Sequence, residues 1–146
     1  MAKSLSVEDG NLDTSTILGS RTREYKDIDL TFANKPSGEI FKKVDAAAVK
    51  QAVKNLILTN YFEKPFQPKF GGNLRDMLFD LADDDAEEDI EERIKNAISI
   101  FEPRAQTLNV TAVATPDRNS IRVTVEFRVI NTQETVTVTT VLARLR

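Results

Sequence analysis

The 146-residue chain carries a formal net charge of −3, with 40% hydrophobic and 29% charged residues, which is the composition of one soluble globular domain. It contains no cysteine and no histidine, which excludes disulfides, thiolate metal sites and imidazole acid–base chemistry. The basic residues are scattered, and no apolar run approaches the roughly 18 residues of a membrane span. We therefore expect no nucleic-acid partner, no membrane partner and no export signal.

The N-terminal part divides into a polar tail and the start of a domain. Residues 1–24 are rich in Ser, Thr, Asp and Gly without a sustained period, which predicts a flexible tail. Residues 25–146 are expected to form a single domain. At its start, Ile28, Leu30 and Phe32 alternate with polar residues, which predicts a half-buried strand.

Three helices are expected in the middle of the chain. The first has Asp45 as its predicted N-cap and ends near residue 59, and the second is short and has Asn73 as its predicted N-cap. The third ends before Pro103, because proline lacks an N–H group and restricts the residue before it. Their apolar stripes comprise Val49, Ala52, Val53, Leu56 and Ile57, then Leu74, Met77, Leu78 and Leu81, then Ile90, Ile94, Ala97, Ile98 and Phe101.

The segment of residues 61–72 links the first two helices and contains two prolines, which exclude a helix there. It also carries Phe62, Phe66 and Phe70. We expect these three rings to hold an irregular segment onto the hydrophobic core.

A run of acidic residues occupies positions 83–92, where only Ala86 and Ile90 are not Asp or Glu. Carboxylates suit Ca²⁺ or Mg²⁺, but an EF-hand loop needs a central glycine, and this run has none. Acidic side chains at a helix N-terminus are favoured by the helix dipole, at about 0.3–1 kcal/mol each. The run therefore predicts a solvated helix start, and we expect neither a metal site nor a cofactor.

Beyond Arg104 the apolar residues recur with the period of two that is typical of strands. Turn-forming residues at 115–119 and 131–134 divide this region into a three-strand meander. The inward faces are predicted to consist of Leu108, Val110, Ala112 and Ala114, and of Ile121, Val123, Val125, Phe127 and Val129. The sequence thus predicts an α+β fold, with three helices packed on a mainly antiparallel sheet that ends in this meander.

The last strand changes phase, because Val136 and Val138 occupy one face and Val141, Ala143 and Leu145 the other. Either a bulge near residues 139–140 corrects the phase, or the final residues leave the domain and pack elsewhere. The strand is then either an ordinary third strand or an open edge that accepts a strand from a partner.

The sequence Phe101-Glu102-Pro103-Arg104 lies where the helical period gives way to the strand period. Proline explains the end of the helix but not the two flanking charges. Arg104 could bond the carbonyl groups at the helix C-terminus or pair with Glu102. Alternatively, its rigid bidentate fork could anchor another protein.

A glycosidase-type site would need two carboxyl groups about 5–9.5 Å apart, one of them with a raised pKa. Asp27, Asp29 and Glu102 are the candidates outside the acidic run. The sequence shows no recognisable buried pair, so we expect no enzymatic activity.

Three motifs in order resemble the sheath-initiator family of phage baseplate wedge proteins, which are also called lysozyme-like and have relatives in type VI secretion baseplates. They are Tyr25-Lys26-Asp27-Ile28-Asp29-Leu30, then Lys64-Pro65-Phe66-Gln67-Pro68-Lys69-Phe70-Gly71, and then the acidic helix that ends in Phe101-Glu102-Pro103-Arg104. The resemblance covers residues 25–146 and departs from the family pattern at the polar N-terminal tail.

The resemblance implies a structural role in a phage tail baseplate, within a virion assembled in the host cytoplasm. It implies that Glu102, Pro103 and Arg104 dock on the wedge core, and that a β edge nucleates the sheath. The sheath-contacting strand would contain Val136, Val138, Val141, Leu142 and Leu145. The implied partners are tail sheath subunits and other baseplate wedge proteins, with tail tube or hub proteins as further candidates. The alternatives are a baseplate component of a contractile secretion system and a lysozyme-type glycosidase.

Overall fold

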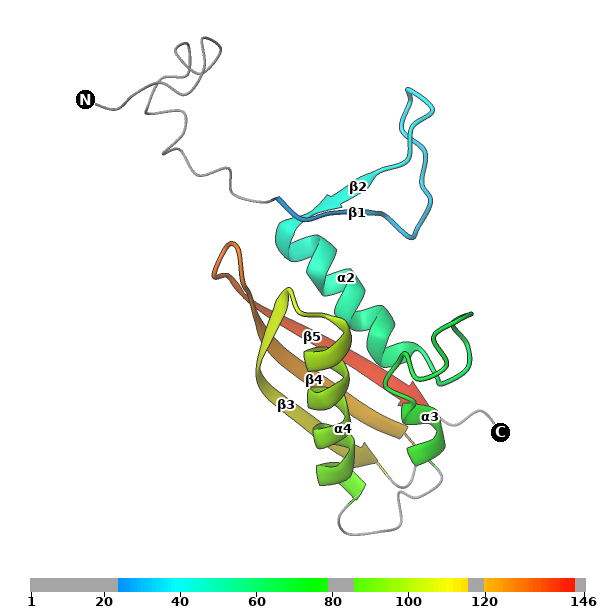
Figure 1. The fold of residues 1–146 in the computed structure, drawn as a ribbon, viewed down its shortest axis with the longest axis vertical. Coiled ribbons are helices and arrows are strands. Elements are labelled where there is room, and N and C mark those ends of the chain that lie inside the picture. The colour runs from blue at the N-terminus through cyan, green and yellow to red at the C-terminus, as the bar shows by residue number, and fades with distance from the viewer. Residues whose placement is uncertain (1–23, 79–85, 116–119, 144–146) are drawn as a thin grey trace, which may run out of the picture.

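The computed structural model describes residues 24–78, 86–115 and 120–143, and Figure 1 shows their arrangement. A hairpin of β1 (Lys26–Ile28) and β2 (Lys42–Val44) precedes three helices, α2 (Asp45–Leu58), α3 (Leu74–Met77) and α4 (Ala86–Phe101). The strands β3 (Ala105–Thr115), β4 (Ser120–Val129) and β5 (Thr135–Ala143) follow. The predicted α+β fold with a C-terminal antiparallel meander is confirmed.

The three long strands form a sheet of order β3-β4-β5, and α2 and α4 pack on one of its faces. Helix α4 lies over β3, and α2 contacts both β5 and α4. Strand β4 alternates as predicted, so its inward apolar side chains are fully buried, each worth roughly 1.5–3 kcal/mol. These core side chains are Ile121, Val123, Val125, Phe127 and Val129.

Asp45 begins α2 but does not cap it, which corrects the sequence prediction. The N-cap is Val44, and among the described residues no side chain caps this helix. Instead, Asp45 Oδ1 accepts hydrogen bonds from the Tyr25 N–H at 3.0 Å and from Asn131 Nδ2 at 2.7 Å. One carboxylate therefore ties the start of β1 and the β4–β5 turn to the same helix end.

The first hairpin is shorter and more exposed than its sequence predicts. The alternation of Ile28, Leu30 and Phe32 predicts that they share the buried face of a strand, but all three are largely exposed, and β1 ends at Ile28. The hairpin lies at the N-terminal end of α2, away from the main sheet (Figure 1), so it has little apolar surface to pack on. Gln51 of α2 holds it by donating to the Ile28 carbonyl at 2.9 Å.

Strand β5 keeps one phase throughout, so of the two alternatives the bulge at residues 139–140 is wrong, and residues 141–143 also stay in the sheet. The ladder from Arg128↔Thr135 to Ser120↔Ala143 runs without a shift. Thr140 occupies an inward position that the hydrophobic pattern could not reveal, and it is buried.

The sheet does contain one irregularity, but it lies in β3. The β3–β4 register shifts between Thr107 and Asn109. Leu108 is therefore exposed instead of lying on the buried face with Val110 and Ala112, which corrects the predicted inward face.

The segment of residues 61–72 also differs from the prediction. Phe70 packs against the core and meets Phe101 edge to face, with ring centroids 5.1 Å apart. Phe62 and Phe66 are exposed instead of buried. The chain returns to the end of α2 at Gly71, where φ is +119° and a Cβ atom would collide with the Thr59 carbonyl oxygen.

Asn73 occupies the N-cap position of α3 as predicted, although its side chain makes no capping hydrogen bond to the helix backbone. Its Oδ1 accepts from the Tyr61 N–H at 3.3 Å, and its Nδ2 donates to Asp76 Oδ2 at 2.7 Å. Asn73 therefore fixes the entry to the linking segment as well as the start of the helix. Leu81, predicted for the apolar stripe of this helix, lies outside the described residues.

Candidate functional site

The end of α4 and the start of β3 form a tight corner. The Glu102 N–H donates to the Ile98 carbonyl at 2.9 Å and completes the last helical turn. Pro103 cannot continue the helix, and the Ala105 N–H bonds back to the Glu102 carbonyl at 3.1 Å. The Arg104 side chain is thereby placed on the same side as Glu102.

Arg104 is the centre of a charged cluster at this corner. Its Nε and Nη2 atoms donate to the two carboxylate oxygens of Glu102 at 2.6 and 2.8 Å, and its Nη1 donates to Asp27 Oδ2 at 3.2 Å. The guanidinium also lies 5.5 Å from the Tyr25 ring centroid. The hydrogen bond to Glu102, with the charges of Glu102 and Asp27, raises the pKa of Arg104 above its ordinary value.

The three predicted docking residues differ in accessibility. Pro103 is exposed, the Arg104 side chain is 26% exposed, and the Glu102 side chain is only 9% exposed. The sequence leaves two local roles open for Arg104, namely bonding the carbonyl groups at the helix C-terminus or pairing with Glu102. The structure shows the pairing with Glu102. A docking partner would therefore meet Pro103 and the outer part of a guanidinium that Glu102 already orients.

The sequence places Tyr25 and Asp27 in one motif but does not reveal that they meet this corner. They lie in and next to β1, and Asp27 is 77 positions away from Arg104. The signal available in the sequence is that both residues belong to the first of the three motifs, around a strand that is otherwise exposed. The first hairpin is thus linked to the corner by charge, in addition to its link to α2 through Gln51.

Each of the three candidate carboxyl groups accepts a hydrogen bond from a neighbouring group. Asp27 and Glu102 both bind the same guanidinium, and Asp29 instead bonds the Thr31 N–H and faces Lys43 at 3.5 Å. The Thr31 hydrogen bond lowers the pKa of Asp29, whereas a general acid needs a raised one. Among the described residues, no group of three or more potential ligands could hold a metal ion.

The two edges of the main sheet differ in whether side chains bond their outward backbone groups. On the β3 edge, the Ala112 N–H donates to Glu91 Oε1 at 3.0 Å and the Ala114 N–H donates to Glu87 Oε1 at 2.7 Å. Both glutamates belong to α4 and to the acidic run. They block backbone groups that could otherwise pair with another strand, a role that the sequence did not reveal.

The β5 edge has no such protection. Among the described residues, no strand pairs with its outer side, and no side chain hydrogen-bonds to its backbone. The Val129 N–H donates to the Glu134 carbonyl at 2.9 Å, and hydrogen-bonded pairs alternate with non-bonded ones along an antiparallel ladder. Counted from that pair, the N–H groups of Thr139 and Val141 face away from β4.

The predicted sheath-contacting residues take three different positions. Val138 and Leu142 are buried in the core, and Val136 is partly buried, so a partner would reach them only through the backbone of the edge. Val141 is exposed on the outer face. Leu145 lies outside the described residues.

Removing the block on β3 should expose that edge. In the double variant Glu87→Ala/Glu91→Ala, we expect the free energy of unfolding to fall by about 1–3 kcal/mol, because two backbone donors lose their acceptors. Concentration-dependent association should appear in sedimentation. Glu88→Ala/Glu92→Ala makes the same charge change on the same helix and is the control. Equal losses in the two variants would show that the β3 bonds contribute nothing specific.

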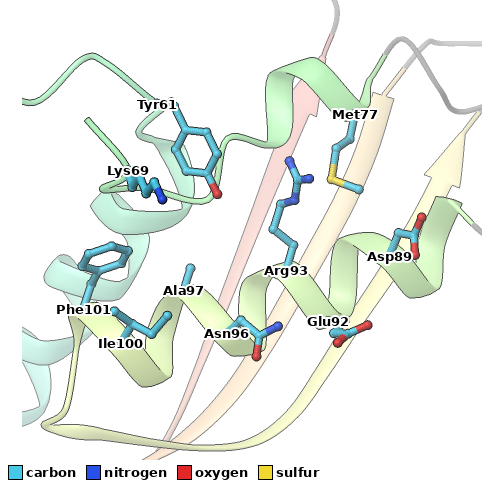
Figure 2. A pocket seen from close by; sticks show the side chains of 11 residues that line it. Tyr61, Lys69, Met77, Asp89, Glu92, Arg93, Asn96, Ala97, Ile100 and Phe101 are labelled. Atoms are coloured by element: carbon cyan, nitrogen blue, oxygen red, sulfur yellow. The ribbon is translucent and has the colours of Figure 1, made fainter. Parts of the chain in front are cut away.

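A groove runs beside α4 and encloses about 590 Å³. Figure 2 shows Tyr61 and Lys69 of the linking segment on one side, and Ala97, Ile100 and Phe101 of α4 on the other. Its other end carries Met77 together with the polar side chains of Asp89, Glu92, Arg93 and Asn96. No helix among the described residues is long and apolar enough to cross a membrane.

Comparison with known proteins agrees with this architecture. Residues 43–134 match the family described as "Baseplate wedge protein gp25". The chain is 26% identical over 107 residues to the baseplate wedge protein gp25 of Enterobacteria phage T4, which is 73% of this chain and 81% of that relative.

Two solved structures share the fold. A candidate tail lysozyme from Geobacter sulfurreducens is 22% identical with a TM-score of 0.59, and the match covers 67% of this chain and 89% of that one. A chain of the anti-feeding prophage baseplate is 19% identical with a TM-score of 0.59, and the match covers 82% of this chain and 86% of that one.

Proposed function

The chain belongs to the baseplate wedge protein gp25 family, and on that premise we propose that it docks on the wedge core through its charged corner and nucleates the sheath through β5. Membership makes it a structural component of the baseplate of a contractile injection system. Docking and nucleation are the finer roles proposed. They place the corner and the open strand on two different partners.

The difference between the two sheet edges carries the nucleation proposal. Glu87 and Glu91 block the β3 edge, whereas β5 leaves outward N–H groups at Thr139 and Val141. An open edge is an aggregation hazard that proteins usually cover, so a long strand that none of the described residues covers favours a role in pairing with a partner strand. The proposed partner of β5 is a strand of a tail sheath subunit.

The geometry of the corner supports docking. Glu102 holds the guanidinium of Arg104 in one orientation, and Asp27 fixes a third side of it. A fork that is oriented in advance loses little conformational entropy when a carboxylate or a carbonyl group of a partner binds to it. The proposed partner is the core of the other wedge proteins, with tail tube or hub proteins as further neighbours.

Electron microscopy of the purified particle tests the proposal directly. We expect density for this domain in the baseplate, with the Glu102-Pro103-Arg104 corner against the wedge core and β5 against the first ring of sheath subunits. Density with the β5 edge facing solvent after sheath assembly would contradict the nucleation role.

The proposed role is structural and not enzymatic. The relatives named above as baseplate wedge proteins support this, and the carboxylate arrangement at Arg104 supports it independently. We propose that the particle is a phage virion assembled in the host cytoplasm, because the curated relative is a phage protein. The same corner and edge would serve a contractile secretion system equally well.

A further inference from the structure

Two phenylalanines of the linking segment project into solvent. Phe66 is fully exposed and Phe62 is 83% exposed, while Phe70 of the same segment packs inward. Both exposed residues have left-handed backbone conformations, with φ values of 66° for Phe62 and 65° for Phe66. Left-handed conformations are rare for bulky side chains and are strained.

The exposed rings are held on a fixed platform. The Phe62 N–H donates to the Pro68 carbonyl at 2.8 Å and closes the loop. At its base, the Glu63 carboxylate accepts from the Asn60 N–H at 2.9 Å and from Asn60 Nδ2 at 2.7 Å. Lys64 Nζ lies over the Phe70 ring, 3.9 Å from its centroid, and ties the loop to that inward-packed residue. The loop is therefore ordered in the conformation that exposes the two rings.

We propose that Phe62 and Phe66 are a pair of aromatic anchors that insert into apolar pockets of a protein partner in the baseplate wedge. The inference rests on the proposed docking function and extends its surface. Persistent strain in a well-bonded segment is a sign of function, and phenyl rings on a rigid loop are effective interface anchors. Without a partner the segment retains two strained backbone positions and two solvated rings.

The anchors are continuous with the docking corner. Phe70 follows Phe66 by four residues and contacts Phe101, which directly precedes Glu102. Ile100 is also exposed and lines the groove between the linking segment and α4 (Figure 2). A partner on the corner can therefore reach the groove and both anchors without crossing the core of this domain.

Two other occupants fit less well. Two phenyl rings bury about 150–250 Å² each, far below the roughly 1,600 Å² of a standard interface, so they suit an extension of a larger contact better than a dimer of this chain. Lipid is disfavoured because Glu63 lies between the rings in sequence. The hydrogen bonds from Asn60 lower the pKa of Glu63, so this carboxylate is charged at neutral pH.

The test uses the full chain and the variants Phe62→Asn and Phe66→Asn, because asparagine tolerates a left-handed backbone. The thermal midpoint should rise by about 2–4 °C in each variant as strain is relieved. Affinity for wedge subassemblies, purified from producing cells that lack this chain, should fall at least about tenfold. Phe32→Asn is the matched control, because Phe32 is also exposed with φ 51° but lies on the first hairpin. It should change stability without changing affinity.

Each other outcome overturns the inference. A lower thermal midpoint in both loop variants would show that the rings pack in the fold. If affinity is unchanged in both loop variants while Arg104→Ala still loses binding, the anchor proposal is wrong and the docking proposal stands. Failure of the wild-type chain to bind the subassemblies would remove docking and anchors together. If the loop variants lose sedimenting dimers in place of subassembly binding, the rings serve self-association. If they instead lose binding to vesicles of 70% phosphatidylcholine and 30% phosphatidylglycerol, the rings bind lipid.

Discussion

Replacing Arg104 with alanine is expected to weaken binding to the wedge core by at least about 2 kcal/mol, which is roughly thirtyfold in affinity. The variant should also lose about 1–3 kcal/mol of folding stability, because the buried Glu102 carboxylate loses the charged partner that donates to both of its oxygens. Chemical denaturation measures the second effect, and co-sedimentation with wedge subassemblies measures the first. Arg104→Lys keeps the charge but not the fork, so it should recover part of the stability and little of the binding.

A second variant separates the structural role of Arg104 from its docking role. In Glu102→Leu/Arg104→Met the buried charge and its partner are both absent, and apolar replacements of buried ion pairs are often neutral for stability. We expect stability near the wild-type value with binding still lost. If this variant binds like the wild type, the guanidinium only holds the corner together and docking depends on its shape.

The parts of the fold that the sequence predicts well are those in which hydrophobic period alone decides the outcome. Helix α4 has an apolar stripe on one face and ends at Phe101, because Pro103 follows two residues later. Strand β4 alternates between buried and more exposed residues from Ile121 to Val129. In both elements the predicted apolar stripe has a buried face to occupy, so the pattern and the packing agree.

The errors arise where the environment of a residue depends on distant segments. Thr140 is buried because its neighbours in the β5 ladder fix its phase, although its hydroxyl group hides it from a hydrophobic pattern. Leu108 is exposed because the register shift in β3 removes it from the inward face. Phe62 and Phe66 were expected in the core because aromatic residues usually are, but the hydrogen-bonded loop points them outward.

The candidate site could be predicted from the sequence only in part, because it too depends on contacts between distant segments. The charges of Glu102 and Arg104 stood out because a helix stop needs only the proline. The contribution of Asp27 required knowledge that the first hairpin folds against the α4–β3 corner. The block on the β3 edge by Glu87 and Glu91 was likewise invisible, because an acidic helix start already explains such residues by itself.

Introducing proline at Thr139 should stop sheath nucleation while leaving the domain folded. The N–H of Thr139 faces away from β4, so its loss removes a donor from the open edge without breaking a bond of the ladder. We expect a stability loss of about 1 kcal/mol. Baseplates containing the variant should assemble, and electron microscopy should show that they lack sheath.

The neighbouring position supplies the matched control. The same phase places the Thr140 N–H in a bond to β4, so Thr140→Pro should lose about 1–3 kcal/mol more than Thr139→Pro. This pair of variants is more informative than truncation after residue 135, which would also remove Val138 and Leu142 from the core. Normal sheaths on Thr139→Pro baseplates would show that β5 does not accept a partner strand through its backbone. The exposed outer face around Val141 would then be the surface left for sheath contact, since the β3 edge is already bonded to α4.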